Sequence, residues 1–485
     1  MSKQHATPFF LLVVSIFTLV FGFNLWAKGL FVDGIYYGAI AQNLMDGYGS
    51  WWQLSPTTHY KDPFFGHPPL GIWMLSYFMQ FFERAFWVER LFSLFNLILL
   101  LWGMAKLWTL TAKPASILST WWVWLLWLCI PINTWSFQQN MLENPMTVFI
   151  VWSVYWSLRA VETKRLWRLL LGGFFIFLAT LTKGPVGLFP LAVIGIYWLV
   201  FRKISFWKAV GGTLMLLISL VGSYAALIEY SEAGKHYLSQ YLHIQVYNSL
   251  TDTAPPIIEH FSILKTFFTE PLALWIGILL LVLKRFWSTS KTPIPKWFFF
   301  FLLLTLAGSL PILISPKQMS FYIVPSLPFL ALTVAHLSYP LLQQGIAKIY
   351  RYQFWQRPLK YSALILIIVS INLSIANYGT FSRDQSIIED ITTLSKVIPP
   401  YSKAIILTKE YPYGTECYFV RIGQIYVNVF RWQKSNEEER KNRTRYLVIE
   451  KDYRKKFHLY KKNPAVKLNN WYYFELKPPK KKKKK

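Results

Sequence analysis

The stretch that decides the fold is residues 9–30, FFLLVVSIFTLVFGFNLWAKGL, which carries no charged side chain before Lys28. A bilayer core about 30 Å thick is crossed by roughly 20 apolar residues in a helix. Lys3 and His5 precede this run, a pattern also found in signal peptides. Its length and the apolar segments behind it favour an uncleaved membrane anchor.

Apolar runs of this kind recur along the chain. Ten further segments are predicted to span a membrane: 91–110, 116–133, 141–158, 166–181, 186–201, 209–229, 271–283, 297–314, 321–342 and 359–378. Composition agrees, since 54% of residues are apolar and only 15% are charged, against about 25% charged in soluble proteins. We therefore expect an α-helical multi-pass membrane protein with about 11–13 transmembrane helices, not a soluble enzyme. The shorter run 68–82 is predicted to lie along the membrane surface.

The basic residues predict the orientation of the chain. With a cytoplasmic N-terminus, most Lys and Arg residues of the short loops fall on the cytoplasmic face, as the positive-inside rule requires. We expect a bacterial inner (cell) membrane protein whose domain 1–379 spans the membrane, with external loops 31–90 and 231–270. A small basic extracytoplasmic domain, 380–479, and a lysine run, 480–485, follow.

The C-terminal region is predicted to be an α/β domain. Short apolar strings at 404–408, 418–422, 425–430 and 446–450 follow a helical pattern at 387–397. The net charge of +28 could alone suggest nucleic acid, but much of the excess lies in this region and in the lysine run. A run of this kind is typically solvated, with affinity for anionic headgroups.

Two classes of chemistry are disfavoured by what the sequence lacks. It has only two cysteines, Cys129 and Cys417, too few for a disulfide framework or a cysteine metal site. It also has no phosphate-binding glycine motif, which argues against an ATP-driven pump.

Three residues at predicted outer helix ends or beside them are candidates for chemistry. Asp33, directly after the first span, could accept a proton from a substrate hydroxyl or amine, or could cap a helix starting at Gly34. Glu143, at the start of another span, could equally stabilise a helix N-terminus. His67 precedes two prolines, which hold it at the edge of the 68–82 run or in a surface turn.

Three cations are predicted on the same outer face. Lys183 lies in the tight turn TKGP, 182–185, Lys317 ends a similar turn, and Arg90 precedes the second span. Together they would suit a phosphate anchored in the outer leaflet, whereas each alone fits ordinary headgroup contact.

These elements, taken in order, resemble the C-type glycosyltransferase (GT-C) superfamily. The closest similarity is to glycosyltransferase family 39, which holds protein O-mannosyltransferases and the bacterial aminoarabinose transferases of lipid A. The motifs that carry the resemblance are Asp33 with Tyr37 and Ala41, HPPL at 67–70, RLFS at 90–93, LENP at 142–145, LTKGP at 181–185, and Lys317 with YIVP at 322–325. Two positions depart from the family, since Gly34 stands where a second acid is common and Glu143 replaces the usual aspartate.

The resemblance implies a GT-C fold and the transfer of a sugar, with inversion, from a polyprenyl-phosphate donor to an extracytoplasmic protein, lipid A or surface glycan. Asp33 and Glu143 would be the catalytic carboxylates, with Asp33 taking the proton of the acceptor. The donor phosphate would be bound by His67, Arg90, Lys183 and Lys317, and the substrates would be contacted by Tyr36, Tyr37 and Tyr322. No cofactor is required and no nucleic acid is expected; a divalent metal at Asp33, Glu143 or His67 is allowed, but no ligand spacing demands it.

Two other classes of function stay open from the sequence. A transporter or flippase for a lipid-linked or anionic substrate would place ionisable residues near mid-membrane in discontinuous helices. A structural membrane protein would use its basic tail to bind an anionic polymer. Neither accounts for ordered motifs on one outer face, and the identities of sugar and acceptor are left open.

Overall fold

The computed structural model describes residues 3–57, 63–112, 116–247, 261–287, 293–315, 317–350, 356–408, 414–431, 445–451 and 464–476. The lysine run 480–485 lies outside the described residues. The chain forms two compact units. Unit 1 comprises Met1–Leu25, Phe65–Gly71 and Arg90–Tyr378, and unit 2 comprises Trp26–Phe64, Ile72–Glu89 and Gly379–Lys485.

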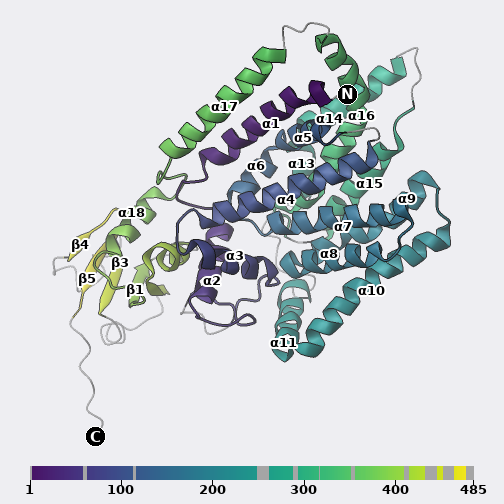
Figure 1. Cartoon of the computed structure of the whole chain (residues 1–485). Helices are drawn as coiled ribbons and strands as arrows, with labels where there is room; N and C mark the ends of the chain where they lie inside the picture. The colour runs from purple at the N-terminus through teal and green to yellow at the C-terminus, as the bar shows by residue number, and fades with distance from the viewer. Residues whose placement is uncertain are drawn as a thin grey trace. The chain divides into compact units, whose positions relative to one another are not determined.

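Unit 1 is helical throughout its described elements (Figure 1). They are α1 (Lys3–Phe23), α4 (Val88–Thr111, which begins in unit 2), η1 (Ile117–Thr120), α5 (Trp121–Leu128), α6 (Pro131–Gln138), α7 (Glu143–Thr163), α8 (Arg168–Lys183), η2 (Pro185–Ala192), α9 (Val193–Phe201), α10 (Phe206–Tyr230), α11 (Glu232–Tyr241), η3 (Leu242–Tyr247), α13 (Ser262–Thr269), α14 (Leu272–Trp287), α15 (Lys296–Ser309), η4 (Leu310–Ile314), η5 (Ser320–Ser326), α16 (Leu327–Tyr350) and α17 (Gln356–Ala376). Every segment predicted to span the membrane is therefore helical, and the multi-pass helical fold class is confirmed.

Fewer helices qualify as single spans than the predicted 11–13. Among the described residues six helices are long and apolar enough to cross a membrane, or up to eight if two bent pairs each form one span. The pair α5–α6 bends by 91° and the pair α13–α14 by 64°. Pro131 begins α6, and proline cannot continue the hydrogen-bond ladder of a preceding helix. Some of the other predicted spans fall short because they are brief, as α8 is with 16 residues. Helix α7 has 21 residues but is not apolar enough to be among the six.

Helices α7 and α8 form a tight antiparallel hairpin (Figure 1). The Ser153 hydroxyl donates to the Gly172 carbonyl at 2.9 Å. A Cβ added at Gly172 would lie 2.7 Å from the Ser157 hydroxyl oxygen, so only glycine permits this close approach. The hairpin brings the first residue of α7 and the last residue of α8 to the same end.

Unit 2 is an α/β unit with one mixed sheet. Its helices are α2 (Val32–Met45), α3 (Leu70–Phe82, which begins in unit 1), α18 (Gln385–Leu394), α19 (Thr415–Tyr418) and η7 (Phe419–Gly423), and its strands are β1 (Lys403–Thr408), β2 (Tyr426–Arg431), β3 (Tyr446–Glu450), β4 (Val466–Lys467) and β5 (Trp471–Glu475). The strand order is β2-β1-β3-β5-β4. Strands β2 and β3 run parallel to β1, and β5 runs antiparallel to β3 and β4. The apolar string 418–422 is helical, because it belongs to α19 and η7.

One hydrophobic core joins distant parts of the sequence within unit 2. Ile35 and Ala39 of α2 pack in the same buried cluster as Ile406 of β1 and Phe419 of η7. Successive residues of β1 point to opposite faces, so Ile405 belongs to a separate cluster on the other face. The segment that follows the first predicted span and the C-terminal region therefore share a core. That residues 380–479 form a separate domain stays a prediction.

Arg421 ties three of these segments together. Its guanidinium forms a bidentate pair with the Glu89 carboxylate, at 2.5 and 3.0 Å. It also donates to Gln42 of α2 at 3.2 Å and to the carbonyls of Arg84 and Ala85 at 2.9 and 2.6 Å. The side chains of Arg421 and Glu89 are 3% and 1% exposed, so each charge depends on the other. Removing one partner of such a pair is strongly destabilising.

We expect Arg421→Met to destabilise unit 2 by about 3–5 kcal/mol, because the Glu89 carboxylate would be left buried without its cation. The measurement is limited proteolysis of the full chain, in which unit 2 should be cut much faster. Arg445→Gln serves as the control, since the Arg445–Glu475 pair is 56% and 46% exposed and should leave the rate nearly unchanged. Equal cleavage of Arg421→Met and wild type would contradict this structural role.

Candidate functional site

Lys183 and Glu143 form a buried ion pair in unit 1. The Lys183 ammonium donates to Glu143 Oε1, and the two side chains are 6% and 0% exposed. The ammonium also lies over two aromatic rings, 5.1 Å from the Phe321 centroid and 5.3 Å from that of Tyr322. Such faces attract cations electrostatically. The lysine is therefore held in one place among groups that favour its charge.

The α7–α8 hairpin explains why these two charges meet. Glu143 is the first residue of α7 and Lys183 is the last of α8. The N-terminus of a helix favours a negative side chain and the C-terminus a positive one, so both helix dipoles stabilise the pair.

Gly184 ends α8 and sets the direction of the lysine. Its φ of +84° is a conformation that other residues rarely adopt. A Cβ at this position would overlap the Tyr241 hydroxyl. The glycine of the LTKGP motif thus allows the chain to turn and lets the Tyr241 hydroxyl lie against the backbone of residue 184.

A polar cavity of about 130 Å³ opens beside the ion pair. Its lining includes both partners together with His67, Lys317 and Tyr322. Four of the residues that the sequence proposed for catalysis or phosphate binding thus surround one space: His67, Glu143, Lys183 and Lys317. Tyr322, a proposed substrate contact, joins them.

His67 is neutral in this setting. Burial lowers its pKa well below the usual value, and the positive charges of Lys183 and then Lys317 lower it further. A neutral imidazole can still donate one hydrogen bond to an anion. Tyr237 holds the backbone in place, because its hydroxyl donates to the His67 carbonyl at 2.9 Å.

Arg90 does not line this cavity. It is 4% exposed and donates to the Gln138 carbonyl at 2.8 Å, and it borders a separate small pocket. The proposed cations therefore do not all converge, and a phosphate role for Arg90 stays a prediction without support from this cavity.

The residues proposed from the first acidic motif belong to unit 2. Helix α2 begins at Val32 with Phe31 as its N-cap, so Asp33 lies inside the first turn and does not cap a helix starting at Gly34. Tyr36 packs edge-on against Phe64, with centroids 5.4 Å apart. Tyr37 is 3% exposed and is part of the packing of α2.

Residues 237–245 contribute to the site and were not singled out in the sequence. Tyr241 and Gln245 line the polar cavity, and Tyr237 supports His67. Their spacing of four residues places them on one helical face, a signal that the sequence does contain. Burial raises the pKa of Tyr241, with smaller contributions from Tyr224 and Tyr322, so its phenol stays protonated and can donate a hydrogen bond.

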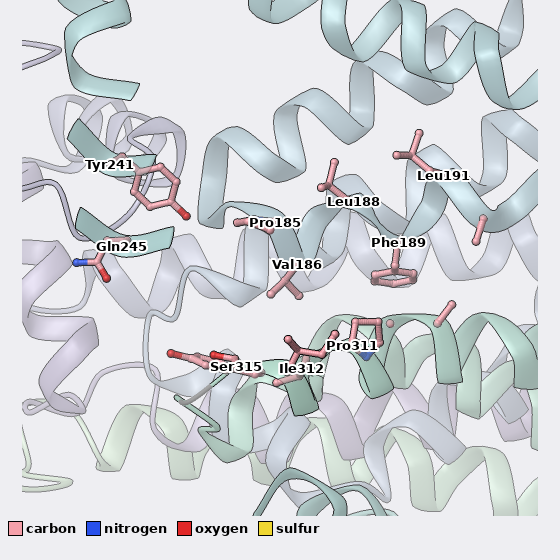
Figure 2. Close-up of a pocket in the computed structure, with 15 residues that line it drawn as sticks. Pro185, Val186, Leu188, Phe189, Leu191, Tyr241, Gln245, Pro311, Ile312 and Ser315 are labelled. Carbon is pink, nitrogen blue, oxygen red and sulfur yellow. The ribbon is translucent and has the colours of Figure 1, made fainter. Parts of the chain in front are cut away.

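An apolar cavity of about 620 Å³ adjoins the polar one. Five residues line both: Val186, Tyr241, Gln245, Ser315 and Tyr322. Figure 2 shows Val186 and Phe189 on one wall, Pro311 and Ile312 on the facing wall, and Tyr241 with Gln245 toward one end. A cationic polar chamber that continues into an apolar one can receive an amphipathic anion, with its charge at Lys183 and its chain along η2 and η4.

Metal ligands do not cluster within the ranges that the structure describes. No group of three or more His, Cys, Asp or Glu there could hold a metal ion.

The ion pair can be tested by a double-mutant cycle. Lys183→Met or Glu143→Leu alone should each cost about 3–5 kcal/mol of stability, since one charge is left buried without its partner. The double variant Lys183→Met/Glu143→Leu should recover most of that loss, because apolar residues replace both charges. Thermal unfolding in detergent measures the effect, and Arg159→Gln, in the exposed Arg159–Glu162 pair of the same helix, is the control. Additive losses in the double variant would show that the pair is not coupled.

Comparisons with known proteins point to the same family that the sequence motifs resemble. Residues 66–227, which hold the HPPL, LENP and LTKGP motifs, match the family model described as dolichyl-phosphate-mannose-protein mannosyltransferase. No curated protein matches the whole sequence closely enough to be recognised as a relative.

Solved structures match over nearly the whole chain. The structure of ArnT from Cupriavidus metallidurans bound to undecaprenyl phosphate is 13% identical, with a TM-score of 0.65 and coverage of 96% of both chains. Its apo form is 14% identical, with a TM-score of 0.63 and coverage of 96% of this chain and 98% of ArnT. The archaeal oligosaccharyltransferase AglB from Archaeoglobus fulgidus, in complex with an inhibitory peptide and a dolichol-phosphate, is 10% identical, with a TM-score of 0.51 over 91% of this chain and 69% of AglB. The chain is therefore a multi-pass membrane protein of the GT-C fold, similar to glycosyltransferase family 39.

Proposed function

We propose that this protein transfers a sugar from a polyprenyl-phosphate donor to an extracytoplasmic acceptor, with inversion at the anomeric carbon. The observation that carries the proposal is the buried Lys183, which lines a polar cavity continuous with an apolar one. A sugar nucleotide has no apolar chain to occupy the second cavity. The undecaprenyl phosphate of the ArnT structure and the dolichol phosphate of the AglB structure are lipids of the chemistry that these cavities fit.

The cations would stabilise the leaving group. During transfer the bond between the anomeric carbon and the phosphate oxygen breaks, and the phosphate gains one negative charge. Lys183 and Lys317 would compensate that charge, and His67 and Tyr241 would donate hydrogen bonds to it; all four residues line the polar cavity. Donors fixed in advance, in a site with little water, are worth more than the same groups in solution.

The proton of the acceptor is assigned to Asp33. As the acceptor oxygen or nitrogen forms its bond to the anomeric carbon, Asp33 would take the proton and become a neutral carboxylic acid. This assignment rests on the motif at the start of the first external segment. Glu143 is the second proposed carboxylate, and its pairing with Lys183 supports a role in holding the lysine until phosphate arrives.

The acceptor, like the sugar, is proposed only as a class. It would be a protein, lipid A or a surface glycan on the outer side of a bacterial inner membrane, with the N-terminus of this chain in the cytoplasm. The GT-C fold does not favour the transporter or flippase that the sequence left open.

The first test asks which class of sugar donor the protein uses. Purified protein in lipid nanodiscs should transfer sugar from polyprenyl-phosphate sugars and not from sugar nucleotides, and Lys183→Ala should raise the donor KM or abolish turnover. Mass spectrometry of envelope lipids, surface polysaccharide and proteins, with and without the gene, would then name the product. Transfer from a nucleotide sugar in the absence of any polyprenyl lipid would refute the proposal.

Asp33→Asn tests the proposed base. Asparagine keeps the shape but cannot accept the proton, so turnover should fall by about 10²- to 10⁴-fold. Stability should change little, because the acid lies in the first turn of α2, where a helix N-terminus gains only about 0.3–1 kcal/mol from it. Undiminished transfer by a folded Asp33→Asn protein would move the role of base to Glu143.

A further inference from the structure

A third hollow lies in unit 1 between α9 and α10, which are neighbours in the fold (Figure 1). Its volume is about 390 Å³, within the ~300–1,000 Å³ typical of ligand clefts. The lining is almost entirely apolar: Gly195, Trp198, Leu199, Phe206, Ala209, Val210, Thr213 and Leu214. None of these residues lines the two cavities described above.

Cations gather where α9 ends and α10 begins. The Arg202 guanidinium lies 3.9 Å from the ring centroid of Trp198, a residue of the groove wall. Lys203 lies 5.9 Å from the Phe201 ring. Ser205 caps α10 by accepting from the Lys208 amide at 3.3 Å, which fixes Lys208 in the first turn. Within the described ranges, no carboxylate forms an ion pair with Arg202, Lys203 or Lys208.

Apolar side chains are exposed beside these cations. Trp207 is 77% exposed, and Phe206, Leu199 and Leu214 are each 50% exposed. A nucleic acid or an acidic peptide would satisfy the cations but would leave the groove empty. An anionic phospholipid satisfies both, because its phosphate suits the cationic rim and its acyl chain suits the groove.

We propose that the groove between α9 and α10 is a binding site for an anionic phospholipid of the surrounding membrane. One acyl chain lies along Gly195, Leu199 and Leu214, and the headgroup phosphate is bound by Arg202, Lys203 and Lys208. This site is separate from the donor cavities and does not depend on the proposed sugar transfer.

A substitution at Gly195, which lines the groove, can fill the space proposed for the acyl chain. A Cβ added there meets no atom within 4 Å, so Gly195→Leu should enter the acyl-chain space without disturbing the packing. Gly222 of α10 is a matched control, because a Cβ there also meets nothing within 4 Å and the residue does not line the groove. Both substitutions place the same side chain on a helix surface.

The experiment is native mass spectrometry of the full-length protein titrated with phosphatidylglycerol, and separately with phosphatidylcholine. Wild type and Gly222→Leu should retain phosphatidylglycerol preferentially, and Gly195→Leu should lose that preference. Each removed rim cation should weaken binding about fivefold, so Lys203→Gln/Lys208→Gln should bind roughly 25-fold more weakly. The control Lys284→Gln/Lys296→Gln removes two exposed cations elsewhere and should bind like wild type.

Equal retention of the two lipids by wild type would mean an unspecific annular lipid and would overturn the site. Equal phosphatidylglycerol binding by Gly195→Leu and Gly222→Leu would overturn it as well. Because binding is read by mass and needs no donor, failure here leaves the sugar-transfer proposal standing, and failure of transfer leaves this site standing.

Discussion

The buried pair of Lys183 and Glu143 is the constraint around which unit 1 is arranged. Removing two charges from water costs several kcal/mol per ion, so the pair persists only where other interactions offset that desolvation cost. The dipoles of α7 and α8 stabilise the two charges at their helix ends. The rings of Phe321 and Tyr322 add cation–π stabilisation of the Lys183 ammonium. An entering phosphate would compete with Glu143 for the same ammonium, which makes the pair a natural place to bind an anion and release it again.

A second constraint is that the polar cavity beside Lys183 directly adjoins the apolar cavity. Tyr241 and Gln245 line both cavities, and Gly184 allows the Tyr241 hydroxyl to lie against the backbone of residue 184. A side chain at residue 184 would push this boundary apart.

Unit 2 depends on a different buried pair, since Arg421 and Glu89 join α2 to the C-terminal residues. The helix that carries Asp33 is therefore fixed by a hydrogen bond from Arg421 to Gln42, two residues that lie 379 positions apart in the sequence.

Much of this could be predicted from the sequence, for identifiable reasons. Runs of apolar residues are sufficient to predict helices, and the TKGP turn predicted a lysine aimed by glycine and proline. The HPPL and LTKGP motifs indicated His67 and Lys183 as phosphate-binding candidates. Both residues line one cavity in the structure, and their role stays a prediction. The pairing of Lys183 with Glu143 could not be predicted, because it depends on how α7 and α8 pack. Arg90 was grouped with the cations since a span begins beside it, yet its side chain turns to the Gln138 carbonyl. Tyr241 and Gln245 were missed because residues 231–270 were predicted to be an external loop, so their four-residue spacing was not interpreted as one face of a helix.

Photo-crosslinking of the lipid in place tests the central claim most directly. A photoreactive amino acid at Leu188, in the wall of the apolar cavity, should crosslink to added polyprenyl phosphate, and Lys183→Ala should abolish that crosslink by removing the anchor of the phosphate. The same probe at Ile365 of α17, which is 61% exposed and lines neither cavity, should not give a crosslink that depends on Lys183. Crosslinks at Leu188 that persist unchanged in Lys183→Ala, or that are as strong at Ile365, would contradict the account.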